Sequence, residues 1–233
     1  MNLPDKYRVI DLTQPIHEKM TTWPGDPQTR HENWAEISSH GFFLNALTIG
    51  EHTGTHCGAP GHFIQNGPDV SQIPATSLFR AFVKMDKSDV CSIDADFLLG
   101  KEHIVEWEKQ FGEIEKTSIL LVQTNRSALW NDPRLYLGMD GERMHFPGIG
   151  QEAAEYLIQK RGIAGIGIDT HGVDGGRAST FPVGKMLARH RLMHIENLTN
   201  LALIDKSRGY LFIGALPIVG GSGSPCRVLA LVE

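Results

Sequence analysis

Two apolar runs separated by a helical stretch constrain the fold of this chain more than any other feature of its sequence. The first run, TSILLVQT at 117–124, contains no charged residue, which is typical of a strand buried on both faces. The helical stretch at 150–162 carries its apolar residues on one side and stops at Gly162. The second run, IAGIGID at 163–169, follows directly. Strand, helix and strand in this order predict a βαβ unit within an α/β fold.

Further patterns extend this unit along the whole chain. A second helix is predicted at 101–111, where apolar residues recur on one face and Gly112 follows. Strands are predicted at 7–13, 42–49, 80–86, 191–198, 210–218 and 226–233. Many strands and few helices favour a mixed sheet. No internal repeat, low-complexity segment or linker interrupts the sequence, so a single domain is expected over residues 1–233.

Composition excludes several classes of function. The net charge is −5 and no run of basic residues occurs, which argues against nucleic acid as a partner. The first residues have no apolar signal core and no run of eighteen apolar residues follows, so no membrane partner is expected. The three cysteines are odd in number and widely spaced, which favours a reducing, cytoplasmic location over a disulfide framework.

The segment EHTGTHCGAPGHF at 51–63 is the strongest candidate for a site. His52 and His56 are four residues apart, and because Gly54 makes a helix improbable, a loop must direct both imidazoles toward one point. Two imidazoles and a carboxylate suit zinc or manganese and leave a position for water. His62 would then carry a proton. The alternative is a set of structural loop histidines, and three in eleven residues favour the site.

The same segment, HTGTHCGAPGH, resembles the signature H-x-G-T-H-x-D-x-P-x-H of the cyclase family of metal-dependent hydrolases, which includes kynurenine formamidases and isatin hydrolases. Further blocks in the family's order are VIDLTQPI with WPGDP, FPGIGQEAAEYL, GIGIDTHGVD, IENLTNL and GGSGSPCRVLAL. The resemblance implies an α/β fold whose mixed sheet has a swivelling β/β/α core, a small-molecule substrate, and a homodimer or homotetramer.

The resemblance also implies site residues. His52, His56 and Glu196 match metal ligands of the family, and His62 matches its proton carrier, with Glu196 a second catalytic candidate. Two ligand positions depart from the family: its aspartate is Gly58 here, and its later histidine is Gly184. The pattern therefore implies at most one divalent cation, zinc or manganese, or no metal at all. A neighbouring histidine could repair the site, and the candidates are His171, His190 and His194.

Three functions remain open from the sequence. The first is hydrolysis of an amide, formamide or lactone carbonyl in a small cyclic or aromatic substrate. The second is a metal-independent lyase or cyclase that uses His and Glu as acid and base, and the third is a non-catalytic ligand-binding relative. Trp23 and Phe42 are the candidate substrate-binding residues of an aromatic pocket. The GGSGSP stretch lacks the Lys-Ser/Thr ending of a phosphate loop and is interpreted as a turn.

Overall fold

The computed structural model describes residues 6–233 of the chain, and residues 1–5 lie outside the described part. The strands are β1 (Arg8–Asp11), β2 (Arg30–Ala35), β3 (Leu44–Thr48), β4 (His56–Gly58), β5 (Phe79–Asp86), β6 (Leu98–Leu99), β7 (Ile119–Gln123), β8 (Gly148–Ile149), β9 (Gly165–Ile168), β10 (Met193–Glu196), β11 (Arg208–Ala215) and β12 (Gly223–Val232). The α-helices are α2 (Ile37–His40), α3 (Ser88–Ile93), α4 (Lys101–Phe111), α5 (Pro133–Leu137), α6 (Gln151–Tyr156) and α7 (Pro182–Arg189).

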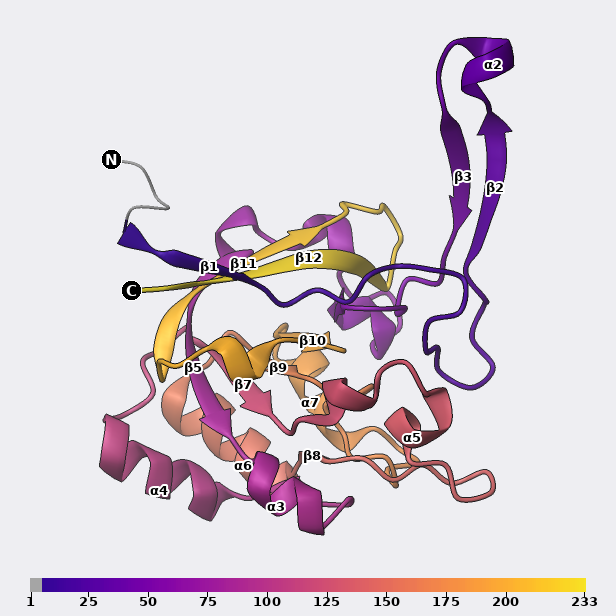
Figure 1. The fold of residues 1–233 in the computed structure, drawn as a ribbon. Coiled ribbons are helices and arrows are strands. Elements are labelled where there is room, and N and C mark those ends of the chain that lie inside the picture. Colours follow the sequence, from indigo (N-terminus) through magenta and orange to yellow (C-terminus); the bar gives the residue numbers. More distant parts are fainter. Residues whose placement is uncertain (1–5) are drawn as a thin grey trace.

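The main sheet is mixed and closes on itself. Its strand order is β1-β12-β11-β5-β7-β9-β10-β4, and β4 pairs with β12 as well as with β10. Strands β5, β7, β9 and β10 run parallel, while β1, β4, β11 and β12 make antiparallel pairs. In Figure 1 the layer of β1, β11 and β12 lies above the parallel strands, and α3, α4 and α6 lie below them. The predicted α/β fold with a mixed sheet is confirmed.

The parallel strands separate two hydrophobic cores. Ile119 and Leu121 of β7 point into the core enclosed by the closed sheet, where they pack with residues of β11 and β12. Leu120 and Val122 point the other way, against α4, α6 and α7. All four side chains are at most 1% exposed. Burial on both faces is the physical reason for the unbroken apolar run at 117–124.

The local patterns identified most elements and missed others. Helix α4 spans 101–111 as predicted, and Gly112 follows it at φ 83°. Helix 150–162 begins as α6 and continues as the π-helical turn η5 (Leu157–Arg161). Helix α7 and strand β2 were not predicted. The histidine segment was predicted to be loop throughout, which is wrong for β4, because its backbone closes the sheet between β10 and β12.

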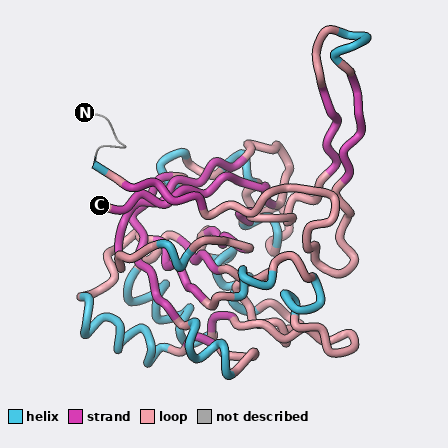
Figure 2. The backbone as a smooth tube through the Cα atoms, viewed as in Figure 1, coloured by secondary structure: helices cyan, strands magenta, loops and turns pink. Residues whose placement is uncertain are grey.

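Strands β2 and β3 form a hairpin that projects from the body of the molecule, as Figures 1 and 2 show. The helix α2 sits at its tip. Large apolar side chains on it are largely exposed: Trp34, Ile37, Phe42, Phe43, Leu44 and Leu47. Among the described residues no helix combines the length and the apolar character that a membrane span requires.

Candidate active site

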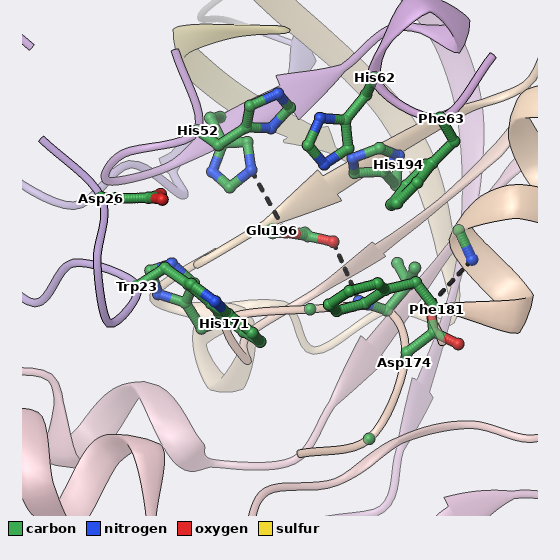
Figure 3. A pocket seen from close by; sticks show the side chains of 15 residues that line it. Trp23, Asp26, His52, His62, Phe63, His171, Asp174, Phe181, His194 and Glu196 are labelled. Atoms are coloured by element: carbon green, nitrogen blue, oxygen red, sulfur yellow. Dashed lines mark hydrogen bonds and ion pairs between the residues drawn. The ribbon is translucent and has the colours of Figure 1, made fainter. Parts of the chain in front are cut away.

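A pocket at one edge of the closed sheet collects the histidines of the signature segment. Its cavity volume is about 290 Å³. The lining residues are Trp23, Asp26, His52, His56, His62, Phe63, His171, Gly172, Val173, Asp174, Gly175, Phe181, Gly184, His194 and Glu196. In Figure 3 His52, His62 and His194 lie on one side of this pocket, and Trp23, His171 and Phe181 lie on the other. The pocket therefore has an imidazole side and a largely aromatic side.

Strand pairing brings the imidazoles and the carboxylate together. His56 begins β4 and lies opposite Glu196, the last residue of β10, in the antiparallel register. His194 and Glu196 are two residues apart on β10, so their side chains emerge on the same face. His52 lies in the turn before β4, and His62 ends the 3-10 helix η1 (Pro60–His62), with the two ring centroids 3.8 Å apart. His52 and His56 thus converge in one pocket with Glu196, which is distant from them in sequence.

His56 is held from both ends of its ring. Its Nδ1 lies 3.0 Å from the Gly54 carbonyl, and its Nε2 lies 3.2 Å from Glu196 Oε2. The other carboxylate oxygen of Glu196 accepts a hydrogen bond from the Val173 N–H at 3.0 Å. Burial disfavours charge on His56, but the Glu196 carboxylate outweighs it and raises the pKa of His56. Burial likewise opposes ionisation of Glu196, yet the neighbouring imidazoles hold its pKa below the usual range.

His52 is oriented by residues that the sequence analysis did not single out. Its Nε2 lies 3.0 Å from Ser222 Oγ, which in turn donates a 2.7 Å hydrogen bond to Glu51 Oε2. Because Ser222 Oγ donates to Glu51, it accepts from His52, so Nε2 is the protonated nitrogen of a neutral His52 and Nδ1 is left as the free acceptor. Ser222 had been interpreted as part of a turn. The role of Ser222 depends on a contact between segments that are distant in sequence. The one signal in the sequence is that Glu51, its hydrogen-bond partner, directly precedes His52.

The uncharged imidazoles of the pocket fit a metal cation. Burial lowers the pKa of His194 to about 4 and that of His171 to about 3, and it lowers the pKa of His52 far below its usual range. Their unprotonated nitrogens are available as ligands at neutral pH. One nitrogen from each of His52, His56 and His194 can be chosen so that all three lie within 4.8 Å of one another. The donor set present in the pocket therefore suits a divalent transition metal.

Aromatic rings form the facing side. The Trp23 ring centroid lies 5.5 Å from that of His171 and 6.0 Å from that of Phe181, and Phe181 lies 6.0 Å from Phe63. Trp23 therefore lines the pocket, as expected for a substrate-binding residue. The prediction that Phe42 lines it is wrong within this chain, because the projecting hairpin carries Phe42 away from the body and leaves it 55% exposed.

At both glycines that depart from the signature, the space that a side chain would need is filled by a residue from another part of the chain. A Cβ atom at position 58 would clash with the imidazole of His194, and one at position 184 would lie 2.7 Å from Phe63 Cε2. Of the three candidate replacement histidines, His171 and His194 line the pocket. His190 does not, and instead it is exposed at the end of α7, where its Nδ1 contacts the Met186 carbonyl.

Two carboxylates near the pocket organise its loops. Asp174 Oδ1 accepts the Val183 N–H and Oδ2 accepts the Gly184 N–H, which fixes the first turn of α7. Asp169 Oδ1 accepts the backbone N–H and the hydroxyl of Thr124. Asp169 and Asp174, which flank His171 in the sequence, therefore both stabilise loops beside the pocket.

Comparison with known proteins identifies relatives of the chain. Residues 10–175 match the Cyclase family, described as "Putative cyclase". An isatin hydrolase of Roseibium aggregatum is 33% identical over 217 residues, which cover 88% of this chain and 82% of that protein. A kynurenine formamidase of Bacillus thuringiensis subsp. konkukian is 29% identical, covering 94% and 95%. The structure of isatin hydrolase A from Ralstonia solanacearum superposes with a TM-score of 0.92 at 31% identity, over 99% of this chain and 94% of that one.

Proposed function

The chain belongs to the cyclase family and is a hydrolase of that family, and on this premise we propose that it opens the ring of a small, uncharged, fused aromatic cyclic amide such as isatin. One observation carries the proposal: an imidazole cluster with a carboxylate faces an aromatic side across a cavity of about 290 Å³. Such a cavity is near the lower end of the range for small-molecule sites, so it suits one flat ring system. The imidazole cluster faces the carbonyl, and the aromatic rings pack on the substrate.

Charge distinguishes this substrate from the second candidate, the formamide of an aromatic amino acid, which the kynurenine formamidase relatives support. Such a formamide carries an α-carboxylate that needs a cationic or strongly donating partner when buried. Within the described part of the chain no lysine or arginine lines the pocket, whereas Asp26, Asp174 and Glu196 do. An uncharged cyclic amide is therefore the better match.

Amide hydrolysis requires a nucleophilic water, stabilisation of charge on the carbonyl oxygen, and a proton for the departing nitrogen. A divalent cation, zinc or manganese, supplies Lewis acidity when bound. We assign His52 and His56 as two of the residues that hold it. Glu196 accepts the proton of the attacking water, and His62, which remains in contact with solvent, delivers a proton to the nitrogen as the C–N bond breaks. The product of this ring opening is one molecule that carries both a carboxylate and an aromatic amine.

Two roles are open to Glu196: the resemblance implies a metal ligand, and its position also suits an acid–base group. Its two oxygens already interact with His56 Nε2 and with the Val173 N–H, and its pKa lies below the usual range because the neighbouring imidazoles outweigh the effect of burial. These contacts hold an ionised carboxylate beside the imidazole cluster. The low pKa makes Glu196 a weak base, so the acid–base assignment rests on geometry, which fixes an ionised oxygen beside the imidazole cluster.

The test is a comparison of two substrates with the metal-loaded protein. We expect isatin ring opening, followed by absorbance, to proceed with a kcat/KM at least about tenfold above that for N-formylkynurenine, a difference of ~1.4 kcal/mol in transition-state binding. Treatment with a chelator should remove both activities, and zinc or manganese should restore them. Equal rates on untreated and chelator-treated protein would contradict metal assistance. A preference for N-formylkynurenine would instead assign the second candidate function.

We also propose that the chain forms homodimers through the β2–β3 hairpin. Trp34 is 71% exposed and Phe43 is 61% exposed on this projecting element, and apolar patches of this kind mark association surfaces. Replacing both residues by aspartate should halve the molar mass measured by light scattering without unfolding the protein, since neither side chain contributes to a core. The matched control is Ile93→Asp, at a still more exposed apolar residue that lies on α3, away from the hairpin. A wild-type protein that is monomeric at all concentrations would refute the proposal.

A further inference from the structure

His194 occupies the space that a side chain at position 58 would need. Gly58 lies directly opposite His194 in the antiparallel pairing of β4 with β10. A Cβ atom at Gly58 would clash with Nε2 and Cε1 of His194. The imidazole in its present position therefore excludes every other residue type at position 58. In the signature that position holds an aspartate, so the imidazole lies where the side chain of that ligand would begin.

The position of His194 completes a set of nitrogen donors. One nitrogen each from His52, His56 and His194 lies within 4.8 Å of the other two. Ser222 Oγ fixes Nε2 of His52 and leaves its Nδ1 free to accept, while the Gly54 carbonyl fixes Nδ1 of His56 and directs its Nε2 toward Glu196 Oε2. His194 is only 3% exposed, and it sits among these rings. Three imidazoles with one open position are a usual catalytic arrangement for zinc.

The second departure from the signature closes a different part of the pocket. A side chain at Gly184 would meet the Phe63 ring at 2.7 and 3.0 Å and Asp174 Oδ2 at 3.3 Å. Asp174 is engaged in capping α7 through the N–H groups of Val183 and Gly184. The space beside Gly184 thus holds an aromatic ring and a carboxylate that already has partners. These residues leave room for one cation at the imidazole cluster and none beside α7.

We propose that His194 is the third protein ligand of a single cation, that it replaces the carboxylate ligand missing at Gly58, and that the site holds zinc on three imidazoles. This proposal rests on the proposed function, because it names a ligand of the same catalytic site. Three neutral donors leave the full charge of the cation uncompensated. Imidazole suits zinc, whereas carboxylate ligands favour manganese. The exchange of carboxylate for imidazole therefore shifts the metal preference of this chain toward zinc.

The first experiment measures zinc binding without reference to turnover. Zinc stoichiometry is determined by mass spectrometry of the gel-filtered protein, and zinc Kd by competition with a chromogenic chelator. The wild-type chain should bind one zinc. His194→Phe, which keeps a planar ring over Gly58, should weaken zinc binding by more than the ~10–100-fold expected of an outer partner. His190→Ala, which removes an exposed histidine outside the pocket, is the matched control and should bind as the wild type does.

A double-mutant cycle tests the link between positions 58 and 194. Gly58→Ala removes no ligand, but its Cβ displaces the imidazole, so it should weaken zinc binding in the wild-type background. In a His194→Ala background the same substitution should have little further effect, because the clashing ring is gone. Gly58→Asp combined with His194→Ala restores a carboxylate ligand, and it should recover binding while favouring manganese over zinc. This double variant also provides a measurement if His194→Ala alone does not fold.

The outcomes separate this proposal from the proposed function. If His194→Phe binds zinc as tightly as the wild type, the ligand assignment is wrong even if isatin is hydrolysed. It is also wrong if Gly58→Ala weakens zinc binding as much in the His194→Ala background as in the wild type. Two zinc ions per chain overturn the single site. A zinc affinity that depends on His194 together with no turnover of isatin or N-formylkynurenine supports the ligand assignment and refutes the proposed substrate.

Discussion

Replacement of Glu196 by glutamine is expected to lower kcat/KM for isatin by about 10²–10⁴-fold, the usual contribution of a positioned general base. Glutamine retains the shape of the side chain and can still accept the Val173 N–H. It removes the negative charge beside His56 and the oxygen that would take a proton from water. The reaction is therefore slowed at the chemical step, and the effect should appear in kcat rather than in KM.

A measurement of zinc affinity distinguishes whether Glu196 acts as a base or as a metal ligand. If Glu196 acts as the base while His52, His56 and His194 hold the cation, Glu196→Gln should weaken zinc binding by no more than about 10–100-fold, the cost of losing an outer partner, which is less than the loss of a direct ligand. A loss of zinc affinity as large as that of His194→Phe would instead assign Glu196 as a ligand, as the family resemblance implies. Glu102→Gln, in an exposed position on α4, controls for the loss of one charge.

Asn197→Ala is expected to produce a large loss of stability, about 2–5 kcal/mol in the free energy of unfolding. The buried amide of Asn197 accepts a hydrogen bond from Tyr136 Oη at 2.7 Å and donates one to the Gly54 carbonyl at 2.8 Å. Its removal deletes both hydrogen bonds, at about 1–3 kcal/mol in total, although Tyr136 Oη keeps the Asp169 carbonyl and the Gly54 carbonyl keeps His56 Nδ1 as partners. Alanine is also strained at the observed φ of 55°, at about 1–2 kcal/mol.

A second asparagine on the same loop separates the two causes. Asn200 has a φ of 57°, but it is exposed, and its side-chain amide donates a hydrogen bond to the Asp11 carbonyl. Asn200→Ala should therefore cost only the backbone strain, about 1–2 kcal/mol. Urea denaturation of both variants measures the difference, and Asn197→Gly should recover the strain alone. Equal losses for the two alanine variants would show that the buried amide contributes nothing.

The buried network around Asn197 also bears on the active site. The Gly54 carbonyl that accepts from Asn197 also lies 3.0 Å from His56 Nδ1, and Thr55 Oγ1 donates to the Asn197 carbonyl at 2.7 Å. Burial raises the pKa of Tyr136 well above its usual value, so its hydroxyl stays protonated and donates. The histidine loop is thus fixed to the end of β10 before any substrate or cation binds.

Much of the fold could be predicted because local patterns reflect burial directly. The run at 117–124 is apolar because β7 is buried on both faces, and 101–111 shows a one-sided pattern because only one face of α4 meets the core. Helix α7 escaped prediction because its first turn is stabilised by Asp174 from a distant loop. The hairpin residue Phe42 was misplaced because an exposed aromatic residue resembles a pocket residue in sequence alone.

The sequence by itself predicted the family and the α/β class, and the resemblance implied the three signature histidines and two glycines, Gly58 and Gly184, at ligand positions. It could not determine what occupies those positions. The register of β4 against β10 decided that His194 lies over Gly58, and the packing of η1 against α7 decided that Phe63 fills the space beside Gly184. Local spacing reports which face a residue occupies, whereas a metal or substrate site requires side chains from several segments to meet, and only tertiary packing brings them together.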